Sequence, residues 1–280
     1  THVAGIAAAE ANNGIGISGV SHGAKIMPLK VFPSSGSGDA ATITQGIIYA
    51  TQKGATIINM SFGGYRRSIT MENALMTAYL TANLVASAGN DGESIYYNDP
   101  DNPTTEYPAA LPYVFGVQAN EGFSNYDPDG PIYSNFEEGY NYELKAPGTA
   151  LSTTPGGNYR VMSGTSMSAP IVSGALSLYT SFFPDKSRED LWGDIIHTSS
   201  DDINIFQAMF NRVKNPFFDL LESHVIDTLP GCDRDNQADA GETVQIWVKI
   251  RNTFAFADSL YVLLQQSIYG DTSDVSILAD

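Results

Sequence analysis

The longest apolar run of the chain extends from Ile171 to Phe183, and Pro184 follows it. Hydroxyls are its only strongly polar side chains and no face is charged, a pattern that predicts a helix buried on all sides. The loop residues ahead of the run place Ser166 at the N-terminal end of this helix. Unpaired backbone N–H groups and the helix dipole stabilise negative charge there, which suits a nucleophilic serine that forms an oxyanion. A cluster of helix-capping hydroxyls is the alternative that these residues leave open.

Between residues 25 and 87, short β-rich runs alternate with helical segments. The predicted order is strand, helix, strand, helix, strand over residues 25–31, 40–53, 56–62, 71–81 and 84–87. This alternation predicts an α/β fold, a doubly wound parallel sheet with helices on both faces. Ligands bind such sheets at the carboxyl ends of the strands. Further segments are expected as helices over 1–11 and 187–198 and as strands over 114–119 and 144–148, with a polar surface loop over 91–106.

The composition of the chain changes after about residue 215, where the sequence becomes rich in β-formers. We predict a first domain over 1–215, a linker over 216–224 and a β-sandwich domain over 225–280, with strands at 243–250 and 259–264. A closed sandwich usually has about seven strands, so these residues are expected to form only part of one. The acidic segment Asp233–Thr243 fits either a calcium site or a solvated turn.

The charge of the chain limits its partners. It carries 14 basic and 31 acidic residues, a net charge of −17. Such a chain is repelled by nucleic acid phosphates and by anionic membranes, so we expect neither as a partner. No apolar run reaches the length of a membrane span. The single cysteine, Cys232, cannot form an internal disulfide and says little about compartment.

Four short motifs occur in a fixed order along the chain. They are Thr1-His2-Val3-Ala4-Gly5, Ile58-Asn59-Met60-Ser61-Phe62-Gly63-Gly64, Ala86-Ser87-Ala88-Gly89-Asn90-Asp91-Gly92 and Gly164-Thr165-Ser166-Met167-Ser168-Ala169-Pro170. Together they resemble the subtilisin-like serine proteases, the subtilases, over about residues 1–212. In that family the corresponding segments read His-Gly-Thr-His-Val-Ala-Gly, Ser-Leu-Gly-Gly, Ala-Ala-Gly-Asn and Gly-Thr-Ser-Met. The resemblance implies a secreted, monomeric serine endopeptidase that acts on proteins or peptides, with an Ig-like module after the catalytic domain.

The resemblance also implies roles for individual residues. Ser166 is the expected nucleophile, and the side-chain amide of Asn90 is expected to stabilise the oxyanion. His2 matches the second histidine of its motif, which is not the catalytic base. The base is expected two residues before Thr1 and the triad aspartate further upstream, so the chain as given is expected to lack both and to be inactive. The other histidines, His22, His197 and His224, have no motif around them and are expected at the surface or in the core.

Other protease and hydrolase classes fit the residues less well. The related sedolisin-type acid proteases carry an aspartate where this chain has Asn90. A lipase-like hydrolase needs Gly-x-Ser-x-Gly, and Ser168 stands where its second glycine should be. The competing interpretation from another class is a non-catalytic relative or an extracellular binding module whose sandwich domain carries the function.

Glycine-rich stretches at the strand ends predict the substrate cleft, since glycine lets a peptide approach and pair with the backbone. The implied substrate-binding positions are Gly36, Ser37, Gly38, Ser61, Phe62, Gly63, Ala86, Ser87, Ala88 and Gly89. A further glycine-rich loop resembles a subtilase calcium loop, with the Asn13 side chain and the carbonyls of Ala11, Ile15 and Ile17 as implied ligands. A plain glycine turn is the alternative for this loop. No cofactor is expected for catalysis.

Overall fold

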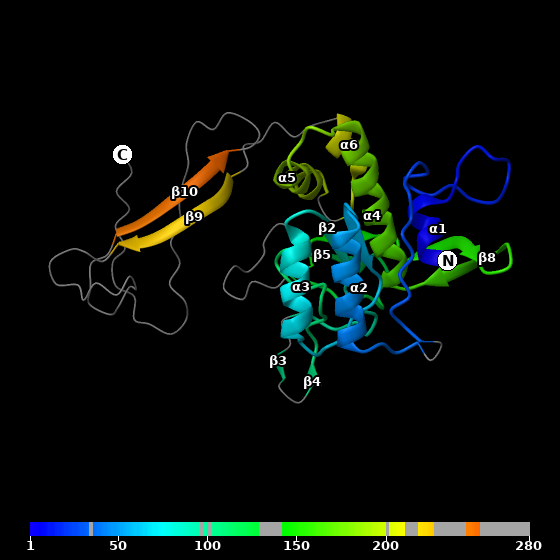
Figure 1. Cartoon of the computed structure of the whole chain (residues 1–280), viewed down its shortest axis with the longest axis horizontal. Coiled ribbons are helices and arrows are strands. Elements are labelled where there is room, and N and C mark those ends of the chain that lie inside the picture. The colour runs from blue at the N-terminus through cyan, green and yellow to red at the C-terminus, as the bar shows by residue number, and fades with distance from the viewer. Residues whose placement is uncertain are drawn as a thin grey trace. The chain divides into compact units, whose positions relative to one another are not determined.

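The computed structural model describes residues 1–33, 36–95, 98–99, 102–128, 142–199, 202–210, 218–226 and 245–252. The chain divides into two compact units, Thr1–Arg212 and Val213–Asp280, a boundary close to the predicted one at 215 (Figure 1). No helix in the described ranges has the length and hydrophobicity that crossing a bilayer requires.

The first unit is built on a four-stranded parallel sheet in the order β1-β2-β5-β6. The strands are β1 (Ile57–Met60), β2 (Asn83–Ser87), β5 (Phe115–Ala119) and β6 (Leu144–Ala146). Each lies within a segment predicted as a strand or differs from it by a residue or two. The parallel sheet predicted from the alternating pattern is therefore confirmed.

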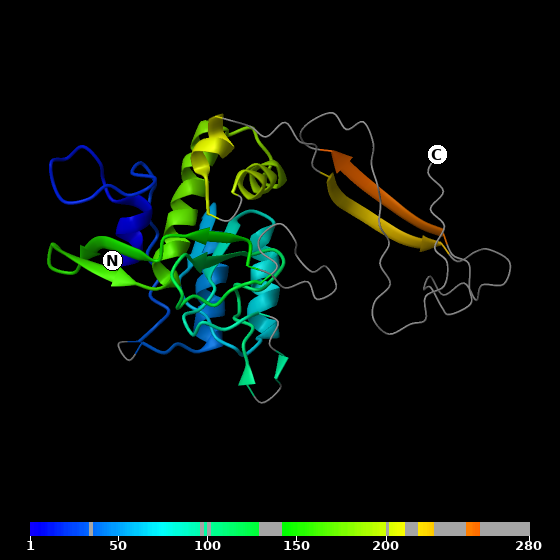
Figure 2. The same cartoon turned by 180° about the vertical axis from the view of Figure 1, so that it is seen from behind.

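Helices cover both faces of this sheet. On one face, α2 (Ala40–Gln52) and α3 (Ile69–Tyr79) pack side by side in front of the strands in Figure 1, and Figure 2 shows the sheet from behind. On the other face, a second core includes residues of α4 (Thr165–Phe182), α5 (Arg188–Thr198) and α6 (Ile205–Phe210). The side chains of β2 divide accordingly, because Leu84 belongs to the first core and its neighbour Val85 to the second.

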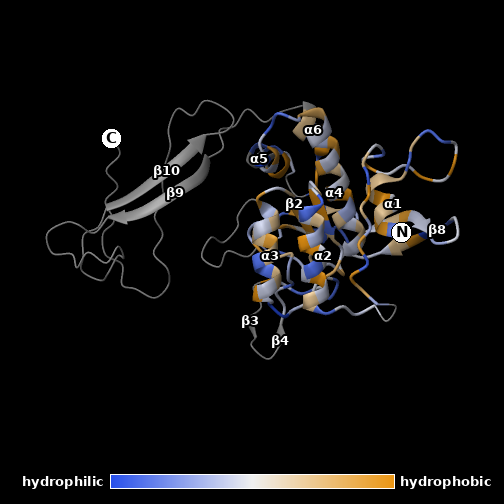
Figure 3. Ribbon diagram, in the orientation of Figure 1, coloured by the Kyte–Doolittle hydropathy of each residue, from blue (hydrophilic) through white to orange (hydrophobic). Residues whose placement is uncertain are grey.

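Helix α4 is the central element of the second core. It contacts all four strands of the sheet, and Val172, Leu176 and Tyr179 are fully buried on it. Figure 3 shows α4 without strongly hydrophilic residues, whereas α2 and α3 carry both orange and blue positions. The prediction of a helix buried on all sides is correct for most of its length. Its last turn emerges into solvent, where Phe182 is 58% exposed.

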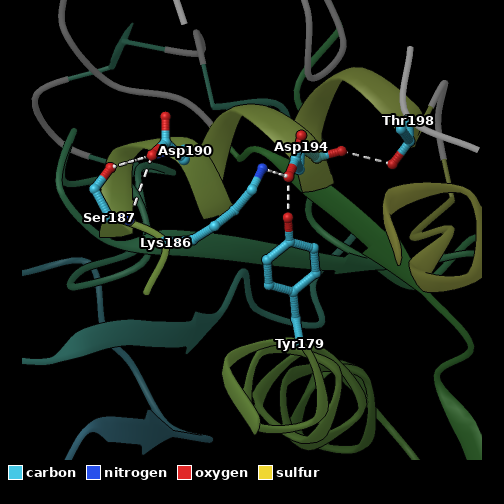
Figure 4. A network of polar contacts seen from close by, with 6 residues as sticks. All are labelled: Tyr179, Lys186, Ser187, Asp190, Asp194 and Thr198. Atoms are coloured by element: carbon cyan, nitrogen blue, oxygen red, sulfur yellow. Dashed lines mark hydrogen bonds and ion pairs between the residues drawn. The ribbon is translucent and has the colours of Figure 1, made fainter. Parts of the chain in front are cut away.

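A polar network fixes α5 against α4 (Figure 4). The Tyr179 hydroxyl of α4 donates to the Asp194 carboxylate of α5, and Lys186 forms an ion pair with the same carboxylate. Asp194 is 3% exposed, and these two contacts help to stabilise its buried charge. Helix α5 itself begins with a capping box between Ser187 and Asp190.

The predicted strand over residues 25–31 is wrong for the described structure. This segment joins no sheet, and Ile26, Met27 and Leu29 are between 37 and 48% exposed. Its apolar pattern is that of a strand, but a strand forms only where a neighbouring strand satisfies its backbone groups. Among the described residues, β2 is the only strand hydrogen-bonded to β1, and no strand pairs with residues 25–31.

The remaining elements of the first unit are short. Helix α1 (His2–Ala8) packs on α4 and on the hairpin of β7 (Thr149–Thr154) and β8 (Asn158–Ser163), a hairpin that the sequence pattern did not predict. The loop predicted over 91–106 contains the two-residue strands β3 (Asn98–Asp99) and β4 (Asn102–Pro103).

The described part of the second unit is an antiparallel pair, β9 (Phe218–Ile226) and β10 (Gln245–Asn252). Strand β10 matches the predicted strand at 243–250, but β9 occupies most of the predicted linker 216–224. A register shift explains this error. Lys249 pairs with Glu222 and Ile250 pairs with Leu220, so Leu221 is an extra residue that interrupts the alternating pattern by which a strand is recognised. The predicted strand 259–264 and the acidic segment 233–243 lie outside the described residues.

Candidate active site

Ser166 lies in the first turn of α4, beyond the carboxyl ends of the sheet strands. Helix α4 begins at Thr165, earlier than the apolar run by itself predicts, and Gly164 is its N-cap. Ser166 is half-buried, and its hydroxyl donates to the carbonyl oxygen of Ser61 at 3.2 Å. The nucleophile candidate therefore stands at the positive end of a helix and beside the segment that follows β1.

A proline in α4 links this helix to the cleft segment. Pro170 has no N–H, so it cannot make the hydrogen bond to the carbonyl of Ser166 that a regular helix would contain. The Ser61 hydroxyl donates to this carbonyl instead, at 3.0 Å. Asn59 donates in turn to the Ser61 hydroxyl at 2.9 Å and accepts from Ser173 of α4, also at 2.9 Å. Two turns of α4 are thus fastened to the end of β1, which fixes the position of Ser166.

Asn90 reaches the same helix start from the neighbouring strand. Its side-chain carbonyl accepts from the Thr165 N–H at 2.8 Å and from the Thr165 hydroxyl at 3.1 Å. Because two donors fix this oxygen, the NH2 group of the amide is directed away from Thr165 and is available as a donor. Asn90 is exposed, and no described residue accepts from that NH2 group.

Gly164 leaves room for this arrangement. Its φ of 149° is in the region that favours glycine. A Cβ atom on Gly164 would lie 3.7 Å from the Asn90 amide nitrogen and 3.8 Å from the Ser166 backbone nitrogen. A larger side chain here would enter the space between the amide and Ser166. The amide of Asn90 and the backbone N–H of Ser166 therefore flank one space, as donors to a developing oxyanion must.

The structure brings two of the three predicted substrate-binding stretches together around a cavity of about 510 Å³. Gly36, Ser37 and Gly38 line it together with Ser61, Phe62 and Gly63. Ile43 of α2 and Met71 of α3 are part of the wall, so the cavity is partly apolar. The third stretch, Ala86–Gly89, is buried at the end of β2 and does not line the cavity. Its contribution to the site is backbone: the Gly89 N–H donates to the Thr165 hydroxyl at 3.2 Å.

No described histidine side chain is hydrogen-bonded to Ser166. The His2 ring is buried and its Nε2 is 2.8 Å from the carbonyl oxygen of Arg160 in β8. His22 is exposed, His197 is on α5 and His224 is on β9. Within the described ranges, the Ser166 hydroxyl is bonded to Ser61 and to no histidine.

The glycine-rich loop after α1 has only part of the set of oxygen ligands that a hard cation takes. Asn13 is exposed, and its Oδ1 accepts from the Ile15 N–H at 3.0 Å, a local turn that orders the loop by itself. The implied donors are four neutral oxygens, fewer than the six to eight that Ca²⁺ takes. No group of three or more His, Cys, Asp or Glu side chains arranged for a metal is found in the described part of the chain.

Two ionisable residues next to the site, Glu106 and Tyr65, escaped the sequence analysis. Glu106 is 8% exposed, and burial, with the nearby charge of Asp91, raises the pKa of its carboxyl to about 7. Burial and a hydrogen bond to Asp91 raise the pKa of Tyr65 to about 12. The signal available in the sequence was weak, because Glu106 lies at the end of a polar loop and far along the chain from the motifs it meets.

Comparison with known proteins agrees with this geometry. The family model described as "Subtilase family" matches residues 1–226. The chain is 37% identical over 234 residues to the cell wall-associated protease of Bacillus subtilis (strain 168), covering 83% of this chain and 24% of that protein. It is 36% identical to subtilisin DY of Bacillus licheniformis, covering 71% of this chain and 69% of the relative.

Among solved structures, it superposes on proteases from Pseudoalteromonas arctica PAMC 21717 with a TM-score of 0.63 and 28% identity. That superposition covers 75% of this chain and 69% of that one. The chain spans about a quarter of the length of the first relative, the cell wall-associated protease. With a family model that matches more than half of its residues, and with the serine, the asparagine and the parallel sheet arranged as described, the chain belongs to the subtilase family.

Proposed function

We propose that the protein is a serine endopeptidase that hydrolyses peptide bonds through an acyl-enzyme on Ser166. The observation that carries this proposal is the pair formed by Asn90 and Ser166 at the start of α4. The Asn90 amide is oriented by Thr165 and has its NH2 group free, next to the half-buried Ser166 hydroxyl. A helix-capping serine needs no such partner, whereas a nucleophile that creates an oxyanion does.

In the proposed reaction, the Ser166 oxygen attacks the scissile carbonyl and its proton passes to a histidine. The tetrahedral oxyanion is stabilised by the Asn90 amide and the N–H groups at the start of α4, and its collapse expels the amine and leaves the acyl-enzyme, which water hydrolyses. The family resemblance implies that an aspartate orients this histidine. The peptide would lie along the backbone of Ser61–Gly63 and Gly36–Gly38, which both line the cavity.

The test is active-site labelling of the natural full-length protein with a fluorophosphonate, together with hydrolysis of casein. Ser166→Ala is expected to abolish both signals, whereas Ser163→Ala, a neighbouring hydroxyl in β8, serves as the matched control and is expected to leave them intact. Labelling that persists in Ser166→Ala would refute the assignment of the nucleophile. The 280-residue chain by itself is expected to label poorly, since its Ser166 hydroxyl donates to a carbonyl and not to a base.

The proposed location is extracellular, with protein or peptide substrates, a monomeric state and no nucleic acid or membrane partner. The net charge of −17 supports the last two exclusions. A non-catalytic relative is the competing function, and the free amide of Asn90 beside Ser166 favours the enzyme.

We further propose a structural calcium ion at the loop of Asn13, with the carbonyls of Ala11, Ile15 and Ile17 as partial ligands. The donor chemistry supports this, because all four are neutral oxygens of the kind that Ca²⁺ binds. The ion would tie the loop to α1 and would have no part in catalysis. Residues 225–280 are proposed to belong to an Ig-like sandwich, which the antiparallel pairing of β9 and β10 supports. Limited proteolysis is expected to cut this region first if the sandwich is incomplete.

A further inference from the structure

A buried carboxyl group, that of Glu106, lies against the cavity-lining segment Ser61–Gly63. The backbone of the following residue, Tyr107, forms an antiparallel bridge with Gly64, with hydrogen bonds of 3.0 and 2.9 Å. This bridge holds Glu106 against the segment Ser61–Gly63, one of the stretches that line the proposed substrate cleft.

Two glycines enclose this carboxyl. A Cβ atom on Gly63 would lie 2.5 Å from Glu106 Oε1. One on Gly89 would lie 2.4 Å from the Asn125 amide nitrogen and 3.4 Å from the Glu106 carboxyl carbon. Gly63 is exposed to solvent, so the carboxyl lies directly beneath an accessible stretch of backbone. The space that side chains would occupy at these two positions is thus partly filled by the Glu106 carboxylate.

Both glycines are also connected to the nucleophile. The Gly89 N–H donates to the hydroxyl of Thr165, the residue before Ser166. On the other side, Ser61 exchanges two hydrogen bonds with Ser166 and precedes Gly63 by two residues. Ser166 attacks the carbonyl of one residue of the peptide. The side chain of that residue must therefore lie within about one residue length of the nucleophile. The space between the Gly63 and Gly89 segments is where that side chain, the P1 side chain, would enter.

The charge in this space is negative. Asp91 follows Asn90, and its charge acts on Glu106. The Tyr65 hydroxyl donates to Asp91, and Asn125 in turn donates to Tyr65 at 3.2 Å, so the second carboxylate is held in place. Among the described residues, neither a cation nor a hydrogen-bond donor is paired with the Glu106 carboxyl. Arg66 is exposed and lines the adjoining cavity.

A buried carboxylate without a cation is unfavourable, and binding a cationic group relieves this cost. We propose that Glu106, supported by Asp91, is a specificity-determining residue that selects lysine or arginine as the P1 residue of the substrate. This inference rests on the proposed peptidase function and names its substrate class. The partly apolar cavity, whose wall includes Ile43 and Met71, would receive another side chain of the same peptide.

The test compares two fluorogenic peptides that differ only in P1, arginine in one and citrulline in the other. Citrulline has nearly the shape of arginine and no charge, so the ratio of the two kcat/KM values isolates the electrostatic term and cancels effects common to both. For the natural full-length protein we expect arginine to be preferred by roughly 10- to 100-fold, the factor that a charge-assisted contact in a desolvated site contributes. In Glu106→Gln the ratio of the two kcat/KM values should fall to within a few-fold of one, because glutamine keeps the shape of the side chain and removes its charge.

The outcomes separate this inference from the proposed function. If hydrolysis of both peptides survives in Ser166→Ala, the proposed function fails. If hydrolysis depends on Ser166 but wild type shows no preference for arginine over citrulline, the function stands and the role of Glu106 is overturned. An unchanged ratio in Glu106→Gln also overturns it. Should Glu106→Gln be inactive towards both peptides, Glu106→Asp decides the matter, because a shortened carboxylate must keep a preference for arginine if charge is the cause.

Discussion

Replacing Glu106 with glutamine is expected to stabilise the folded first unit at alkaline pH. The pKa of this carboxyl is raised from 4.5 to about 7 by burial first and by the charge of Asp91 second. A folded-state pKa above the unfolded value means that the native protein binds the proton more tightly. Below about pH 4.5 the carboxyl therefore does not lower the free energy of unfolding. Between pH 4.5 and 7 it lowers this free energy progressively, and above pH 7 the loss of stability is complete.

The size of the effect follows from the shift. A difference of about 2.5 pKa units corresponds to roughly 3 kcal/mol of free energy of unfolding. Glutamine has the same shape and stays neutral, so Glu106→Gln should raise the free energy of unfolding by up to about 3 kcal/mol at pH 8.5 and by almost nothing at pH 4.5.

Urea unfolding of the 280-residue chain at pH 5, 7 and 8.5 measures this difference. Trp192 stacks on Phe115 at 3.6 Å between ring centroids and reports on the first unit, and a Trp247→Phe background removes the signal of the other tryptophan. Glu10→Gln, at an exposed carboxyl, is the matched control and should show no such pH dependence. If Glu106→Gln destabilises the protein at pH 8.5, or shifts its stability equally at all three pH values, the assigned burial cost is wrong.

Three further predictions concern the other polar sites. Asn90→Ala in the natural full-length protein should lower kcat by about 10²- to 10³-fold with little change in KM, because the amide meets an anion only in the transition state; a large KM effect with unchanged kcat would place Asn90 in substrate binding. Asp194→Asn should lower the free energy of unfolding by about 3 kcal/mol, because it removes the buried negative charge that pairs with Lys186. Asp190→Asn weakens only a capping box and should lower it by about 1 kcal/mol. Equal effects of the two variants in urea unfolding would contradict this. Calcium should raise the melting temperature of the chain, and Asn13→Ala should remove that increase in a scan with and without chelator; a full increase in the variant would exclude the loop as the site.

Local sequence patterns determined most of the framework of the first unit. The alternation of β-rich and helical runs sets the parallel sheet, because each run must bury its own apolar face. The apolar run after residue 170 sets the buried helix and puts Ser166 at its start. Pro170 also acts locally, since its missing N–H frees the Ser166 carbonyl. The motif around Asn90 was recognisable from the sequence because its residues are consecutive and lie at the end of one strand.

Only the tertiary structure decided the features that depend on partners distant in sequence. Residues 25–31 have the pattern of a strand but find no neighbour in the described structure, and β9 was missed because a bulge at Leu221 hides its alternation. Glu106 is the clearest case. Its burial, its raised pKa and its place beneath Gly63 and Gly89 all arise from segments that pack together only in the fold. Desolvation and charge proximity are properties of position in space, so a residue's neighbours along the chain do not determine them.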